Sequence, residues 1–89
     1  MYFVTAALSK EKAEYLGSLV RQWRIREGRK AGYPDGRPLP LPQAAKLLGC
    51  SRAMLWEIER GRVTPKDREI LAALHRHARI HPAEWWEAA

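Results

Sequence analysis

The sequence predicts a single all-α domain of five helices. It has 89 residues, enough for one modest hydrophobic core and too few for two independent domains. Apolar residues recur at steps of three and four positions, the helical period, and no segment shows a convincing strand pattern. Each periodic run is bounded by capping residues, proline or glycine. We therefore expect residues 1–89 to form one compact helical domain.

The first helix is predicted to begin at Ser9, an N-cap residue, and to end just before Gly28. Residues 1–8 would then form a short N-terminal arm. The apolar positions of this helix fall on one stripe, which consists of Ala13, Leu16, Leu19, Val20 and Trp23.

Residues 29–41 interrupt the helical pattern. They include Gly32, Pro34, Gly36, Pro38 and Pro40, and the Pro-Asp-Gly sequence within them is typical of a turn. We expect a long basic loop between the first two helices.

Two short helices are predicted within residues 41–61. Pro42 is suited to the first turn of a helix that ends at Gly49, where a tight turn requires positive φ. Ser51 caps the next helix, residues 52–60, and Gly61 ends it. Together they form a candidate helix-turn-helix unit. Its inward-facing residues are predicted to be Ala44, Leu48, Cys50, Leu55 and Ile58, with Ala45 kept small where the two helices cross.

The remaining chain predicts two more helices. Thr64 to Asp67 has the pattern of a capping box with proline at the first helical position, and Ile70, Leu71, Leu74 and Ala78 would form the buried face. Residues 81–84 repeat a weaker start signal before Trp85 and Trp86.

The positive charge is concentrated in the middle of the chain. The formal net charge is +6, and residues 21–66 contain eleven basic side chains against four acidic ones. Such an excess favours a polyanionic partner, because lysine and arginine neutralise phosphates and release their counterions. Improved solubility is the alternative explanation for the charge.

The segments AAKLLGCS (44–51), IERG (58–61) and LGSLVRQWRIREG (16–28) resemble the Cro and phage-repressor, or xenobiotic-response-element (Xre), family of helix-turn-helix proteins. The resemblance implies a compact lambda-repressor-like fold and sequence-specific binding to double-stranded DNA. It implies a transcriptional regulator that inserts residues 52–60 into the major groove, and it favours a repressor over an activator.

The resemblance also implies which residues contact DNA. Those expected at base edges are Ser51, Arg52, Ala53, Trp56 and Glu57. Those expected at the DNA backbone are Gln43, Lys46, Arg60 and Arg62, joined by Arg29, Lys30 and Arg37 from the loop. Glu59 resembles the family's structural acid, which would pair with Arg24, so both are left out of the site.

Trp56 has three open roles at this point: contact with thymine methyl groups, contact with a partner protein, or packing over the helix at 42–48. A protein-interaction module is the alternative function, for example an antitoxin or a factor that binds transcription machinery, with Trp56 or Trp85 and Trp86 at the contact. For DNA binding we expect a homodimer on a two-fold operator, because one small module gives limited affinity.

The sequence contains no constellation expected of an enzyme. The single cysteine, Cys50, excludes an internal disulfide and is interpreted as a small buried residue. His77 and His81 have helical spacing but no accompanying carboxylate motif, so no metal site or cofactor is expected. With no membrane-spanning segment, a cytoplasmic, nucleoid-associated protein is expected.

Overall fold

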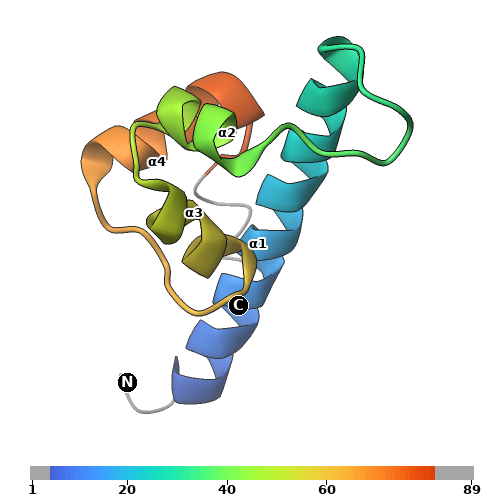
Figure 1. Ribbon diagram of the computed structural model, residues 1–89. Helices are drawn as coiled ribbons and strands as arrows, with labels where there is room; N and C mark the ends of the chain where they lie inside the picture. Colours follow the sequence, from blue (N-terminus) through green and yellow to red (C-terminus); the bar gives the residue numbers. More distant parts are fainter. Residues whose placement is uncertain (1–4, 82–89) are drawn as a thin grey trace.

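The computed structural model describes residues 5–81 of the chain, with side chains from residue 10 onward. It contains four helices and no strand within residues 5–81, so the all-α prediction is confirmed there. The helices are α1 (Thr5–Lys30), α2 (Leu41–Leu48), α3 (Arg52–Glu59) and α4 (Arg68–Ala78). Figure 1 shows α1 running along one side of the cluster that α2, α3 and α4 form. The predicted fifth helix, with Trp85 and Trp86, lies outside the described residues.

Helix α1 starts earlier than predicted. It begins at Thr5, so Ser9 lies within the helix and is not its cap, and residues 5–8 are not part of an arm. Alanine and leucine at positions 6–8 have high helix propensity, which explains the extension. With 26 residues, α1 is about 39 Å long at 1.5 Å per residue.

Helix α1 also ends later than predicted, because Gly28 lies inside it. Gly28 allows the connection to α2 to pass close to the backbone of α1. A Cβ at this position would overlap the carbonyl oxygen of Arg37 and lie 3.0 Å from the amide nitrogen of Leu39. The connection to α2 is therefore residues 31–40, shorter than the predicted loop. It is fixed to α1 by hydrogen bonds that the amides of Tyr33 and Leu39 donate to the carbonyls of Gly28 and Arg24, both 2.9 Å.

The core lies between α1 and the other three helices. Its largest fully buried side chains are Leu16, Val20, Trp23, Leu48, Leu55, Ile58 and Leu74. The predicted stripe on α1 is confirmed, with Leu19 half-buried at its edge. The predicted inward face of α2 and α3 is also confirmed, although Cys50 is only half-buried. Burial of each large apolar side chain contributes roughly 1.5–3 kcal/mol to stability.

Helices α1 and α3 cross closely at Gly17. A Cβ there would lie 2.7 Å from the backbone oxygens of both Ile58 and Glu59, so only glycine permits this approach. About two turns further along α1, Arg24 pairs with Glu59 as predicted, with Nε 2.6 Å from Oε2 and Nη2 2.9 Å from Oε1. These contacts set the position of α3 relative to α1.

Helix α4 begins three residues later than predicted, at Arg68 and not at Pro65. Asp67 is its N-cap, and its carboxylate accepts a hydrogen bond from the amide of Glu69 at 2.7 Å. Residues 63–67 are non-helical, and Pro65 among them is buried. Asp67, and not Thr64, is therefore the residue that caps this helix.

Candidate nucleic-acid interface

The turn between α2 and α3 has the predicted geometry. Gly49 adopts φ 73° and ψ 27°, the left-handed region that glycine enters at low cost. The amide of Cys50 donates to the carbonyl of Ala45 at 3.0 Å, which closes the end of α2. Ser51 caps α3, with its hydroxyl oxygen accepting from the amide of Met54 at 3.0 Å. The turn and its cap therefore fix the direction in which α3 leaves α2.

Helix α3 presents a face of mixed polar and apolar residues that the described residues leave exposed. The predicted base-contacting residues Ser51, Arg52, Ala53 and Trp56 are exposed, and Glu57 is half-buried, whereas Leu55 and Ile58 on the other side are fully buried. A shallow hollow on this face is lined by Arg52, Ala53, Trp56 and Glu57 together with Leu41 at the start of α2. Four of the five predicted base-contacting residues are thus brought together.

Two arginines cluster on the indole of Trp56. The guanidinium carbon of Arg60 lies 4.3 Å from the ring centroid and that of Arg62 lies 5.2 Å from it, both within cation–π range. Arg62 also pairs with Glu57, whose carboxylate is 3.6 Å away. The predicted backbone-contacting pair is therefore joined to two predicted base-contacting residues.

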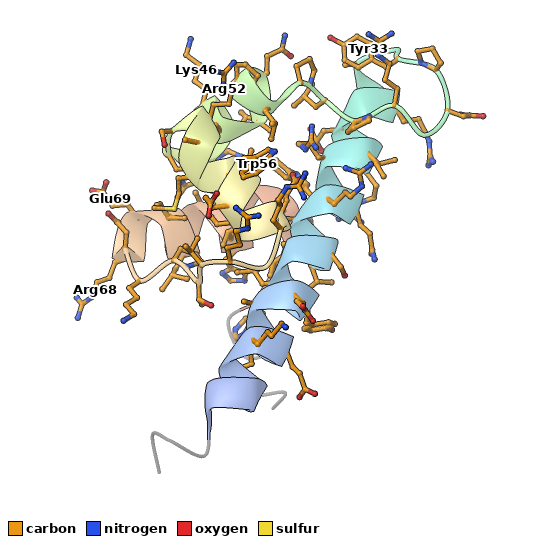
Figure 2. All side chains as sticks on the ribbon, turned by 60° about the horizontal axis from the view of Figure 1, so that its bottom comes forward. Tyr33, Lys46, Arg52, Trp56, Arg68 and Glu69 are labelled. Carbon is orange, nitrogen blue, oxygen red and sulfur yellow. The ribbon has the colours of Figure 1, made fainter. Side chains whose placement is uncertain are left out.

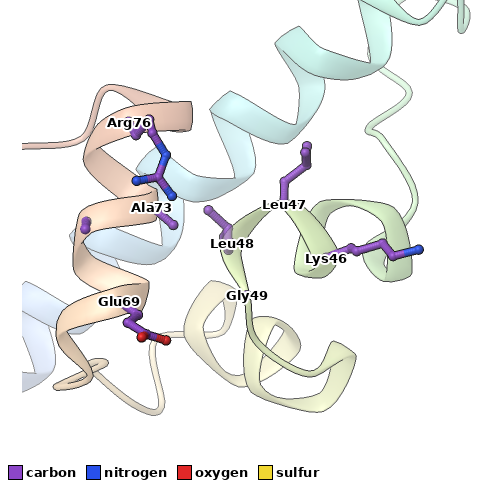
Figure 3. A pocket seen from close by; sticks show the side chains of 8 residues that line it. Lys46, Leu47, Leu48, Gly49, Glu69, Ala73 and Arg76 are labelled. Carbon is purple, nitrogen blue, oxygen red and sulfur yellow. The ribbon is translucent and has the colours of Figure 1, made fainter.

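Gln43 and Lys46 are exposed on α2. In the view of Figure 2, Lys46 and Arg52 project from the same edge of the molecule, and Tyr33 of the connection lies further along that edge. Figure 3 shows a second hollow between α2 and α4, with Lys46 directed away from α4. The ammonium group of Lys46 is thus available to a partner that approaches α2 from outside.

The other three predicted backbone-contacting residues lie at the far end of α1. Arg29 and Lys30 belong to its last turn and not to a loop, and Arg37 lies in the connection. All three are exposed. Lys30 is 3.1 Å from Glu27, and the guanidinium of Arg37 lies 5.6 Å from the ring centroid of Tyr33. Figure 1 shows this end of α1 extending beyond the cluster of α2, α3 and α4.

The structure adds residues that the sequence analysis missed. Met54 on α3 and Leu47 on α2 are large apolar side chains with 37% and 40% of their surface exposed. Leu41 at the start of α2 also lines the hollow on α3, and the sequence analysis gave it no part in the site. The spacing of Trp56 and Arg60, four residues apart on one helix, was a usable signal for their contact.

Burial raises the pKa of the Cys50 thiol above its ordinary value near 9, which disfavours a reactive thiolate. Within residues 5–81, no three histidine, cysteine or acidic side chains are grouped as metal ligands would be. The rings of His75 and His81 meet edge to face with their centroids 5.0 Å apart.

A family model described as a helix-turn-helix domain matches residues 15–85, most of the chain. The chain belongs to this helix-turn-helix family. Helix-turn-helix domains are typical of DNA-binding regulators, and α2 and α3 are the two helices of the motif here. The first ten residues of α1 precede the matched region.

Comparison with curated proteins finds no match, and comparison with solved structures finds none. Among the described residues of this helix-turn-helix protein, no helix has the length and apolar character needed to cross a bilayer.

Proposed function

We propose that the protein is a sequence-specific, double-stranded DNA-binding transcriptional regulator of the Cro and phage-repressor (Xre) kind, and that it acts as a repressor. The observation that carries the proposal is the exposed face of α3, which bears Arg52 and begins at a capped helix start next to a tight turn. Occupancy of an operator by α3 would block the access of polymerase to it.

In this proposal the first turn of α3 faces the bases. The side chain of Arg52 is exposed, and a guanidinium can donate two hydrogen bonds to O6 and N7 of guanine. Ser51 and Ala53 are small enough to allow the helix start close to the groove floor, and the Glu57 carboxylate can accept from a cytosine amino group.

The DNA backbone is contacted on both sides of α3. Gln43 and Lys46 serve one side from α2, and Arg60 and Arg62 serve the end of α3. Arg29, Lys30 and Arg37 would extend these contacts to flanking phosphates, because they lie where α1 extends beyond the helical cluster. We further propose a homodimer that binds a two-fold operator at the nucleoid.

The test starts with duplexes selected from a random library by the purified protein. We expect a selected sequence whose affinity falls steeply with salt, with a log–log slope of about −0.9 for each phosphate contact. Recovery of no preferred duplex would overturn the proposal. The alternative is a protein-interaction module, such as an antitoxin or a factor for transcription machinery. A mainly apolar contact with a partner protein would change little in affinity with salt.

Arginine variants then locate the contact. Arg52→Ala should relax the preference at one base pair and weaken binding to the selected duplex by about 5- to 160-fold, the range for one bidentate contact. Arg68→Ala removes the same charge from the exposed start of α4, which Figure 2 shows well away from Arg52, and should change neither property. Equal effects of the two variants would argue against α3 as the recognition helix.

A further inference from the structure

Trp56 is an unusual side chain for the exposed face of a recognition helix. Its indole has 38% of its surface exposed, which is costly for so large an apolar ring. Two guanidinium groups lie over it, those of Arg60 at 4.3 Å and Arg62 at 5.2 Å from the ring centroid. The ring thus has two cationic partners before any DNA is bound.

The backbone holds both arginines beside this ring. Arg60 is the C-cap of α3, and its amide donates to the carbonyl of Trp56 at 3.1 Å. Gly61 follows with φ 74°, and a Cβ there would lie 2.7 Å from Cγ and 3.1 Å from Cα of Glu14 on α1. Because the turn is packed against α1, Arg62 returns to the same ring that Arg60 contacts.

Electrostatics also favour this arrangement. Two guanidinium groups repel each other, so something must hold them near one another, and the negative face of the indole does so. The carboxylate of Glu57 lies 3.6 Å from Arg62 and supplies the nearest negative charge. Both arginines remain exposed, so a phosphate can approach them.

We infer that Trp56 is a positioning residue, which holds Arg60 and Arg62 as a two-guanidinium site for DNA backbone phosphates at the end of α3. This inference deepens the proposed function and rests on it. Long arginine side chains lose rotamer freedom on binding, and stacking on the ring removes part of that loss beforehand.

A cycle of variants on the full chain tests the inference. The variants are Trp56→Leu, Arg60→Gln with Arg62→Gln, and all three substitutions together, each checked for helicity and thermal unfolding. Dissociation constants are measured for the selected duplex and for an unrelated duplex across a salt series. Trp56→Phe is the conservative variant, because phenylalanine keeps an aromatic face.

Trp56→Leu should weaken binding to both duplexes by the same factor, roughly 3- to 10-fold. That loss should disappear in the background that lacks both arginines, and Trp56→Phe should restore most of the affinity. The variant's salt slope should also be shallower than that of the unsubstituted protein.

Two results would overturn the inference while the proposed function stands. One is a loss confined to the selected duplex with a changed preference at one base pair, which would make Trp56 a base-contacting residue. The other is a full loss that persists when Arg60 and Arg62 are absent. Failure of the unsubstituted protein to bind any duplex would be a different outcome, because it removes the proposed function and the inference together.

Discussion

Removal of the Glu59 carboxylate should destabilise the fold more than any other single charge change on α3. All three guanidinium nitrogens of Arg24 donate hydrogen bonds. Nε and Nη2 donate to the Glu59 carboxylate, and Nη1 donates to the Leu39 carbonyl at 2.7 Å. The side chains of Arg24 and Glu59 are only 8% and 9% exposed. Glu59→Ala would leave a buried guanidinium with two unpaired donors.

Loss of one partner from a buried ion pair costs about 3–5 kcal/mol. A chain of this length has a total stability of about 4–13 kcal/mol, so the change removes a large share of it. With a urea dependence of about 1.5 kcal/mol per molar, the unfolding midpoint should fall by about 2–3 M. Chemical unfolding followed by far-ultraviolet circular dichroism measures this shift.

Glu27→Ala is the matched control, because it removes an acid whose basic partner, Lys30, is 75% exposed. An exposed pair of this kind contributes at most about 1 kcal/mol. Arg24→Met combined with Glu59→Leu should recover part of the lost stability, since it removes both buried charges. Equal midpoint shifts for Glu59→Ala and Glu27→Ala would refute the reasoning.

Three further predictions concern single positions. Gly28→Ala should lower stability by about 1–3 kcal/mol in thermal unfolding, although alanine favours helices, because the new Cβ meets the Arg37 carbonyl; a gain in stability would contradict the close approach. Ser51→Ala should cost about 1 kcal/mol through loss of the α3 cap, whereas Ala53→Ser should change little, and equal unfolding midpoints would contradict the cap. Alkylation of Cys50 by iodoacetamide at pH 8 should be slower in the folded than in the urea-unfolded protein, because burial raises the folded pKa. Stability should fall as the pH rises above about 9, since the unfolded thiol ionises first, and Cys50→Ala should lose this dependence.

Local signals were sufficient to predict the helix-turn-helix unit. Gly49, Ser51 and Gly61 mark turns and caps through their own backbone and side-chain chemistry, so their effect can be inferred without the rest of the fold. The apolar period likewise predicted the buried faces of α1 and α3, because burial depends on which side of a helix a residue occupies. On α4 the prediction is confirmed for Ile70, Leu74 and Ala78, whereas Leu71 is only half-buried and the buried Ala73 was missed.

The early start of α1 follows from local helix propensity, whereas the other errors arose where local signals allow more than one structure. Gly28 has the same local signature whether it ends a helix or lies inside one beneath a crossing chain, and only the position of Arg37 decides between them. Asp67 caps α4 where the four-residue pattern predicted Thr64, and both are capping residue types, so the pattern alone does not distinguish them. The clustering of Arg60 and Arg62 on Trp56 similarly depends on how the chain turns at Gly61 against α1.

These distant contacts connect the stability of the fold to the orientation of the candidate DNA surface. Gly17 and Arg24 hold the end of α3 against α1, while Gly28 and Leu39 hold the connection that leads into α2. Helix α1 thus constrains α3 at its end and α2 at its start. Substitutions at these sites would tilt α3 without altering any residue proposed to contact DNA. If α2 and α3 move together, such a substitution should change the affinity for selected and unrelated duplexes by nearly the same factor. A changed base preference would instead mean that α3 rotates within the groove.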